Sequence, residues 1–258
     1  MKRLSMHAPL VVAFAAAALP AAAKAESFHL VEATVDDIAA QYRAGNLRPE
    51  DVVRMYLARI AAYDRSNVGQ PLNGGVGQQP LNGFMHVNEH AIKDARRPGD
   101  DLDDFDDGDD DGGKPLFGIP IILKDNIATR DMPTTAGSVA LGGSHPKKDA
   151  FIARKLRRAG AIILGKGTLT EYANFIALGM PTGFNSQLRF QLFQVPGADL
   201  SKIGFGFNSY DPRIDPRTKV PVVANDGRPV LATGGSSSGP GIAVGANLAT
   251  IGVGTETS

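Results

Sequence analysis

The sequence predicts an α/β fold in which helices flank a sheet. The 258 residues include 30 glycines but only 7% aromatic residues, which indicates many tight turns, as in a loop-rich α/β enzyme. Residues 119–123 form a short apolar run that suits a buried strand. A helical pattern over residues 149–159 ends at Gly160 and leads directly into a second apolar run, residues 161–164. A helix that passes into a strand through a glycine indicates a layered sheet.

Composition excludes several classes of partner and chemistry. The 27 Lys and Arg residues balance the 27 Asp and Glu residues, so the formal net charge is zero. Nucleic acids and anionic membranes attract proteins with a cationic excess, and we therefore expect neither as a partner. The sequence has no cysteine, which excludes disulfides, thiolate metal sites and a thiol nucleophile.

The first 25 residues have the pattern of a secretory signal peptide. Lys2 and Arg3 supply the positive start, residues 8–19 are mostly apolar, and small residues surround the cleavage positions Ala23 and Ala25. The apolar stretch is shorter than the roughly 20 residues that a membrane span needs, which disfavours an uncleaved anchor. We expect cleavage near Ala23 or Ala25, a periplasmic or secreted protein, and no stable membrane association afterwards.

Residues 26–65 predict a layer of two helices. Thr34 is a suitable N-cap for the first helix, and Gly45 ends it. Pro49 begins the second helix. Its apolar residues have the i, i+3, i+4, i+7 spacing of one stripe: Val53, Tyr56, Leu57 and Ile60.

Residues 66–113 predict little regular structure. The exceptions are a strand over residues 84–87 and a short helix over residues 88–95. Nine aspartates stand in the twelve positions 100–111, and their repulsion opposes compaction. We interpret this segment as a solvated acidic loop rather than a calcium site, because its glycines do not have the EF-hand spacing.

Residues 114–258 alternate helical and strand patterns and predict an α/β core. Asp149 is a suitable N-cap for the helix between the first two strands. Ile152, Leu156 and Ala159 fall on one face of that helix, which we expect to be buried. The small apolar residues 242–254 predict a further helix and strand.

Two short motifs have a functional and a structural interpretation. His86 and His90 match the H-x-x-E-H pattern of some zinc peptidases, but a strand ends between them, so we expect their side chains to diverge and no metal to bind. Residues 160–168 approach a phosphate-binding loop, but Gly167 has no hydroxyl for magnesium. We interpret this segment as a strand-to-loop turn with a solvent-exposed Lys166.

Two other features favour catalysis. Lys124 ends an apolar strand, and burial there would lower the pKa of its amine and make a neutral base available near pH 7. Taken alone, such a lysine is more often a surface group. The second feature is the run Gly-Gly-Ser-Ser-Ser-Gly at residues 234–239, in which glycines allow a close approach of the backbone while serines present hydroxyls. A flexible linker is the alternative, but a linker does not usually lead directly into an apolar helix.

Three ordered segments resemble the amidase signature family of serine hydrolases. They are G-I-P-I-I-L-K-D-N at residues 118–126, G-K-G-T-L-T-E-Y-A-N-F at residues 165–175, and the glycine-serine segment 234–257 with its ending G-T-E-T. The resemblance implies a mixed sheet flanked by helices of the amidase signature type. That fold would be incomplete here, because the chain ends inside the signature.

The resemblance also implies a Ser-Ser-Lys triad that hydrolyses a carboxamide or peptide-amide bond. Lys124 corresponds to the catalytic lysine, and Ser236 to the bridging serine that follows a cis peptide bond. The nucleophilic serine would stand two residues beyond Ser258, so we expect a truncated form without it. The backbone of Thr257 and Ser258 would supply only the beginning of the oxyanion hole.

Further expectations follow from the same resemblance. Ser237 and Ser238 are expected as hydrogen-bond donors behind the triad, and Met180 as a possible contact of the substrate. The substrate would be a small-molecule amide or peptide amide. No metal or organic cofactor is implied, since the proposed base is an amine. The alternative is a catalytically inactive remnant or a binding protein.

Overall fold

A computed structural model gives the structure of the chain over seven stretches of the sequence. It describes residues 28–64, 80–96, 98, 114–175, 181–193, 204–216 and 227–256. The predicted signal peptide and the acidic loop lie outside the described residues, as do Met180, Thr257 and Ser258. None of the helices in the described part of the chain is both long and apolar enough to cross a membrane.

The centre of the molecule is a mixed sheet of four strands in the order β1-β3-β2-β4. The strands are β1 (Phe84–Val87), β2 (Pro120–Lys124), β3 (Ile162–Gly167) and β4 (Ile251–Val253). Strand β2 is parallel to both of its neighbours, β3 and β4, whereas β1 pairs with β3 in the antiparallel direction. The mixed α/β sheet predicted from the sequence is therefore confirmed.

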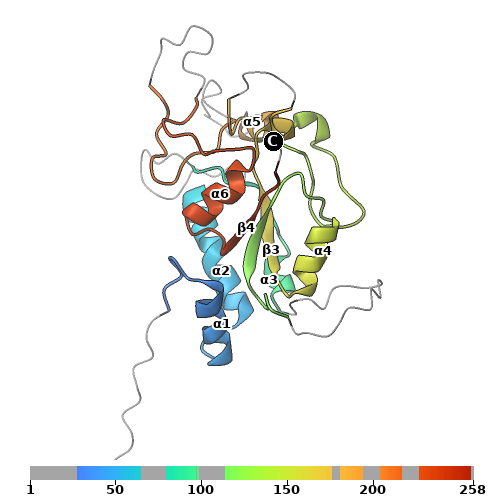
Figure 1. Cartoon of the computed structure of the whole chain (residues 1–258), viewed down its shortest axis with the longest axis vertical. Coiled ribbons are helices and arrows are strands. Elements are labelled where there is room, and N and C mark those ends of the chain that lie inside the picture. Colours follow the sequence, from blue (N-terminus) through green and yellow to red (C-terminus); the bar gives the residue numbers. More distant parts are fainter. Residues whose placement is uncertain are drawn as a thin grey trace, which may run out of the picture.

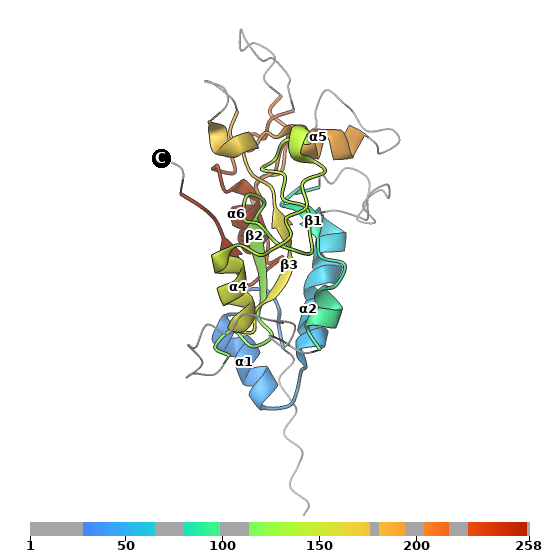
Figure 2. The same ribbon diagram turned by 90° about the vertical axis from the view of Figure 1, so that its right-hand side faces the viewer.

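Helices cover both faces of this sheet (Figures 1 and 2). They are α1 (Val35–Arg43), α2 (Pro49–Arg59), α3 (Ala91–Asp94), α4 (Phe151–Arg158), α5 (Ser186–Phe193) and α6 (Ser238–Gly245). Shorter turns are the π-helical Ile60–Asp64 and the 3-10 helices Val139–Leu141 and Glu171–Asn174. Figure 2 shows α4 and α6 on one side of the sheet and α2 and α3 on the other. Helix α6 contacts all four strands, and α2 contacts β2 and β3.

The N-terminal helices form as their local signals predict. Thr34 caps α1, because its hydroxyl accepts a hydrogen bond from Asp37 N at 3.2 Å and the Asp37 carboxylate accepts one from Thr34 N at 2.9 Å. In α2, Val53 and Tyr56 are buried, so the predicted stripe faces the core. The Tyr42 hydroxyl joins α1 to the α/β core through a 3.0 Å hydrogen bond to Gly118 O.

Burial is most complete in the middle of the sheet. All five residues of β2 and all six of β3 are buried. Strands that are covered on both faces read as continuous apolar runs rather than as alternating patterns, which explains why residues 119–123 could be recognised in the sequence. Two charged residues are exceptions to this apolar rule. Lys124 is the last residue of β2, and Lys166 lies near the end of β3.

Two expectations for α4 are wrong. The helix begins at Phe151 with Ala150 as its N-cap, and Asp149 makes no capping bond. The Asp149 carboxylate is engaged elsewhere, with Arg130 N at 2.7 Å and with Arg157 Nε at 3.1 Å. Ile152 is also not buried, with 44% of its surface exposed, because the covered face of the helix runs through Ala153 instead.

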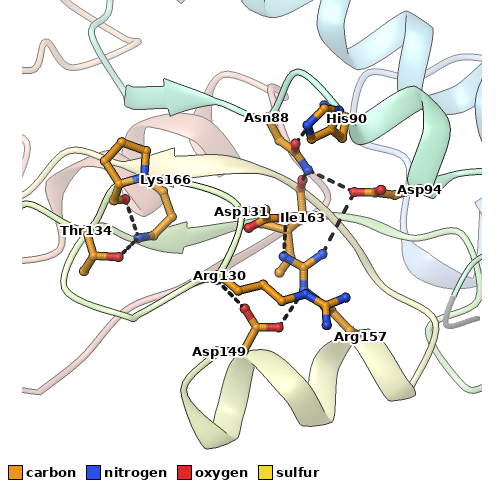
Figure 3. A network of polar contacts seen from close by, with 11 residues as sticks. Asn88, His90, Asp94, Arg130, Asp131, Thr134, Asp149, Arg157, Ile163 and Lys166 are labelled. Carbon is orange, nitrogen blue, oxygen red and sulfur yellow. Dashed lines mark hydrogen bonds and ion pairs between the residues drawn. The ribbon is translucent and has the colours of Figure 1, made fainter. Parts of the chain in front are cut away.

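Arg157 is the centre of a polar network that ties α4 to its neighbours (Figure 3). Its guanidinium lies 2.6 Å from Asp131 and 3.9 Å from Asp94, in addition to the contact with Asp149. Asp94 in turn accepts a hydrogen bond from Asn88 at 3.1 Å. One mostly buried cation thus joins α4, α3 and the loop that follows β2.

Candidate active site

Lys124 and Ser236 meet at the C-terminal end of β2. Lys124 is fully buried, and its Nζ lies 2.7 Å from Ser236 Oγ. Ser236 stands just before α6, which packs on β2, so helix and strand together bring the two side chains into contact. The two residues are 112 positions apart in the sequence, so only the tertiary fold creates this pair.

Three oxygen atoms of Ser236 and Thr255 contact the Lys124 amine. Besides Ser236, the Nζ atom contacts Thr255 Oγ1 at 2.8 Å and Thr255 O at 3.3 Å. Burial lowers the pKa of Lys124, and the charge of Glu256 opposes this shift. Burial therefore makes the neutral form of this amine more accessible than it is for a solvent-exposed lysine.

The backbone around Ser236 is held by residues that follow β3. The peptide bond between Gly235 and Ser236 is cis. Ser236 O accepts a hydrogen bond from Thr170 N at 3.1 Å. A side chain at position 235 would lie 2.8 Å from Thr170 Oγ1 and 2.7 Å from Thr182 Cγ2, so only glycine fits there without a shift. The glycine preceding the serine thus serves close packing.

The next serines support the same corner of the site. Ser237 Oγ accepts a hydrogen bond from Thr255 N at 3.2 Å, which holds the segment after β4. Ser238 is fully buried, and its Oγ lies 3.5 Å from Thr168 O. A Cβ on Gly239 would collide with backbone atoms of Thr168 and Gly83. Helix α6 therefore begins in direct contact with the end of β3.

A second buried lysine lies on the neighbouring strand β3, opposite Leu123, and its position corrects the sequence interpretation. Lys166 is fully buried rather than solvent-exposed. Its Nζ pairs with Asp125 Oδ1 at 3.2 Å and donates to Pro133 O at 3.1 Å. It also donates to Thr134 Oγ1 at 2.8 Å (Figure 3). Three oxygen partners, one of them a carboxylate, compensate the buried ammonium, which explains why the charge is tolerated.

Asp125, which directly follows β2, completes this ion pair. Its carboxylate accepts hydrogen bonds from both the backbone N and the hydroxyl of Thr135, the former at 3.1 Å. Burial raises the pKa of Asp125, and the donors Lys166 and Thr135 oppose that shift. Asp125 N also donates to Gly167 O at 2.9 Å. The residue after Lys124 is thus fixed to β3 and to the loop that contains Thr135.

Comparison with known proteins gives this geometry a family. A family model described as Amidase matches residues 77–184. The chain belongs to the amidase signature family. It is 30% identical over 233 residues to a protein of Arabidopsis thaliana named a probable amidase, and the match covers 90% of this chain and 36% of the relative.

Solved structures of amidase signature enzymes have the same fold. The peptide amidase of Stenotrophomonas maltophilia is 32% identical with a TM-score of 0.60, over 86% of this chain and 35% of that one. An amidase family protein of Bacillus anthracis is 30% identical with a TM-score of 0.62, over 88% of this chain and 36% of that one. The chain thus spans about a third of the length of the relatives that it matches.

Two further residues of the candidate site were not predicted from the sequence. Asn126 and Thr255 lie beside the Lys124 amine, and Asn126 Nδ2 donates to Thr255 Oγ1 at 3.0 Å. Both residues belong to segments that carry the family resemblance, K-D-N and G-T-E-T. Membership of these segments was the only feature of the sequence that could have indicated a place in the site. The sequence could not show that the two segments meet.

The histidines of the H-x-x-E-H pattern lie away from this centre. His86 lies in β1, whereas His90 directly precedes α3. The strand therefore ends between the two histidines, as predicted, and they do not share one helix. Within the described ranges, no three His, Asp or Glu side chains gather into a possible metal site. Of the other expected site residues of the amidase signature, Met180, Thr257 and Ser258 lie outside the described residues.

Proposed function

We propose that the chain supplies the lysine and the bridging serine of an amidase that hydrolyses carboxamide or peptide-amide bonds. The observation that carries this proposal is the 2.7 Å contact between Lys124 Nζ and Ser236 Oγ. The contact lies in a buried site, and burial lowers the pKa of the Lys124 amine. A neutral amine next to a hydroxyl is the arrangement that general-base activation of a serine needs.

In the proposed mechanism a proton moves through Ser236 to Lys124. A nucleophilic serine gives its proton to Ser236 Oγ while the Ser236 proton passes to the Lys124 amine, and the serine oxygen attacks the amide carbonyl. The protonated lysine then returns a proton along the same path to the leaving nitrogen as the carbon–nitrogen bond breaks. Water hydrolyses the resulting acyl-enzyme with the same base and releases the acid.

We place the nucleophile two positions beyond Ser258 of the printed sequence, where the family pattern G-T-E-T-x-G-S would have its last serine. Ser258 itself does not fit the role. It stands two positions before the expected nucleophile, and two residues of extended chain would place its hydroxyl about 6–7 Å away, out of reach of Ser236. The backbone of Thr257 and Ser258 would begin the oxyanion hole. The 258-residue chain alone would therefore lack turnover.

We further propose a peptide amide or a small amide as the substrate of the longer enzyme, with Met180 as a contact. The similarity to the peptide amidase of Stenotrophomonas maltophilia supports this class. The leader pattern of the first 25 residues supports action in the periplasm or outside the cell.

The test compares two proteins. One is the 258-residue chain, and the other also contains the residues encoded in the same reading frame after Ser258. We expect the 258-residue chain not to hydrolyse an aryl amide or a peptide amide. The extended protein is expected to hydrolyse a peptide amide, and Lys124→Ala to abolish that activity while Lys93→Ala, at an exposed position, leaves it unchanged. Turnover by the 258-residue chain that depends on Lys124 would refute the placement of the nucleophile. An inactive extended protein would refute the amidase proposal.

A further inference from the structure

We propose that Thr255 and Asn126 are positioning residues that point the lone pair of the Lys124 amine at Ser236. This inference rests on the proposed function, since it concerns how the neutral lysine acts as a base. It concerns side chains that touch Lys124 but would not react with the substrate.

The hydrogen bonds that a neutral amine can form are limited in number and kind. Such an amine has two N–H donors and one lone pair, and three oxygens surround Lys124 Nζ. Thr255 O, at 3.3 Å, is a carbonyl and can only accept, so it takes one N–H. If Thr255 Oγ1, at 2.8 Å, takes the other, the lone pair is left for Ser236 Oγ at 2.7 Å.

Asn126 makes Thr255 Oγ1 an acceptor toward the lysine. Its Nδ2 donates to that oxygen at 3.0 Å, so Asn126 and Lys124 together occupy both lone pairs of the hydroxyl. The hydroxyl proton of Thr255 then points away from Lys124 and does not compete for the amine's lone pair. Without Asn126, the hydroxyl could turn and donate to Lys124 in place of Ser236.

The Thr255 backbone is held in place independently of its side chain. Thr255 N donates to Ser237 Oγ at 3.2 Å, and Ser237 Oγ lies 3.3 Å from Thr255 O. A Cβ at the preceding Gly254 would lie 2.8 Å from Ser237 Oγ, so the two segments approach closely. Both acceptor oxygens of Thr255 are thereby presented to the lysine from a fixed backbone.

The same three oxygens also serve the lysine after it takes up a proton. The ammonium has three N–H donors, and Ser236 Oγ, Thr255 Oγ1 and Thr255 O can accept one each. The amine therefore need not rotate between the two protonation states. Two effects act on the pKa of Lys124. Burial lowers it and favours the neutral amine, whereas the negative charge of Glu256 raises it and favours the ammonium.

The test measures the pKa of Lys124 in the 258-residue chain, where no turnover is needed. Lysine ¹³Cε chemical shifts are followed against pH by NMR, and the Lys124 signal is assigned by its absence in Lys124→Arg. Thr255→Val removes one acceptor of the ammonium, and we expect the pKa of Lys124 to fall by roughly half to one unit. Thr255→Ser should restore the original value.

The matched control is Thr250→Val. Thr250 lies directly before β4, and its hydroxyl donates to Tyr56 at 2.9 Å, away from Lys124. A purely structural role of Thr255 would change thermal stability, as Thr250→Val does, but would leave the Lys124 titration unmoved. Asn126→Ala leaves the Thr255 backbone contacts in place and should also lower the pKa of Lys124. This variant replaces Thr255→Val in the test if Thr255→Val does not fold.

The outcomes separate this inference from the proposed function. An unchanged pKa of Lys124 in Thr255→Val and Asn126→Ala, or no restoration by Thr255→Ser, would overturn the positioning role. If instead Lys124 of the unaltered chain titrates at the ordinary value for a lysine, a neutral base is absent and the proposed function fails. A lowered pKa that falls further in Thr255→Val and returns in Thr255→Ser supports both.

Discussion

Replacing each of the two buried lysines by methionine should have very different effects on stability. Lys166→Met removes the cation that pairs with Asp125 at 3.2 Å and leaves a buried carboxylate behind. Breaking a buried pair in this way costs about 3–5 kcal/mol. Lys124→Met removes hydrogen bonds to hydroxyl and carbonyl oxygens of Ser236 and Thr255. We expect Lys124→Met to cost less than about 2 kcal/mol, at roughly 1 kcal/mol for each lost hydrogen bond and with partial compensation from the apolar side chain.

The pH dependence of the Lys166→Met effect has a definite sign. Burial already raises the pKa of Asp125, and loss of Lys166 removes the main opposing charge, so the folded-state pKa of the carboxyl should rise further above its unfolded value. A group with a raised folded pKa contributes stability that is present below its unfolded pKa and is lost as the pH rises through the folded pKa. The destabilisation by Lys166→Met should therefore be largest at neutral pH and shrink as the pH falls towards about 4.

Urea unfolding followed by circular dichroism at pH 7 and at acidic pH measures both effects. The double variant Asp125→Asn with Lys166→Met serves as the control, because it removes both charges and should recover part of the lost stability. The reasoning would be refuted if the two single variants differ by less than about 1 kcal/mol at pH 7, or if the deficit of Lys166→Met grows on acidification.

Two further predictions concern the backbone. Gly239→Ala should prevent α6 from docking, because its Cβ would collide with backbone atoms of Thr168 and Gly83, whereas Gly241→Ala in the same helix has open space and should be neutral or stabilise by up to about 1 kcal/mol. Equal thermal stability of the two variants would contradict this explanation. Thr34→Ala should cost about 1 kcal/mol in urea unfolding through loss of the α1 capping box, and Thr34→Ser should cost less; equal losses would show that the hydroxyl is not responsible.

Local signals predicted the elements of this fold better than they predicted contacts between elements. The Thr34 cap and the apolar stripe of α2 depend on residues a few positions apart, and the structure has both. Asp149 also has the residue type of a helix cap, but its carboxylate is used by Arg157 and by the backbone of Arg130. The competing partners come from tertiary packing and have no signature in the local pattern.

The residues of the candidate site also fall into two groups, those that the local sequence indicates and those that depend on contacts between distant segments. The burial of Lys124 follows from the apolar run that precedes it, and Ser236 was found through the glycine-serine segment. Lys166 was misjudged because its partner Asp125 follows another strand, 41 positions earlier in the chain, so nothing near Lys166 in the sequence indicates a compensated charge. Asn126 and Thr255 were missed because their roles depend on contact between segments 129 positions apart.

The separation of Lys124 from Thr255 also orders events during synthesis of the chain. The two residues are 131 positions apart, so Thr255 reaches the lysine only after β4 has left the ribosome and joined the edge of β2. Until then the nascent sheet lacks two of the three oxygens that surround the amine. The complete set of oxygens around the Lys124 amine is thus a late product of folding, and its formation reports that β4 has docked.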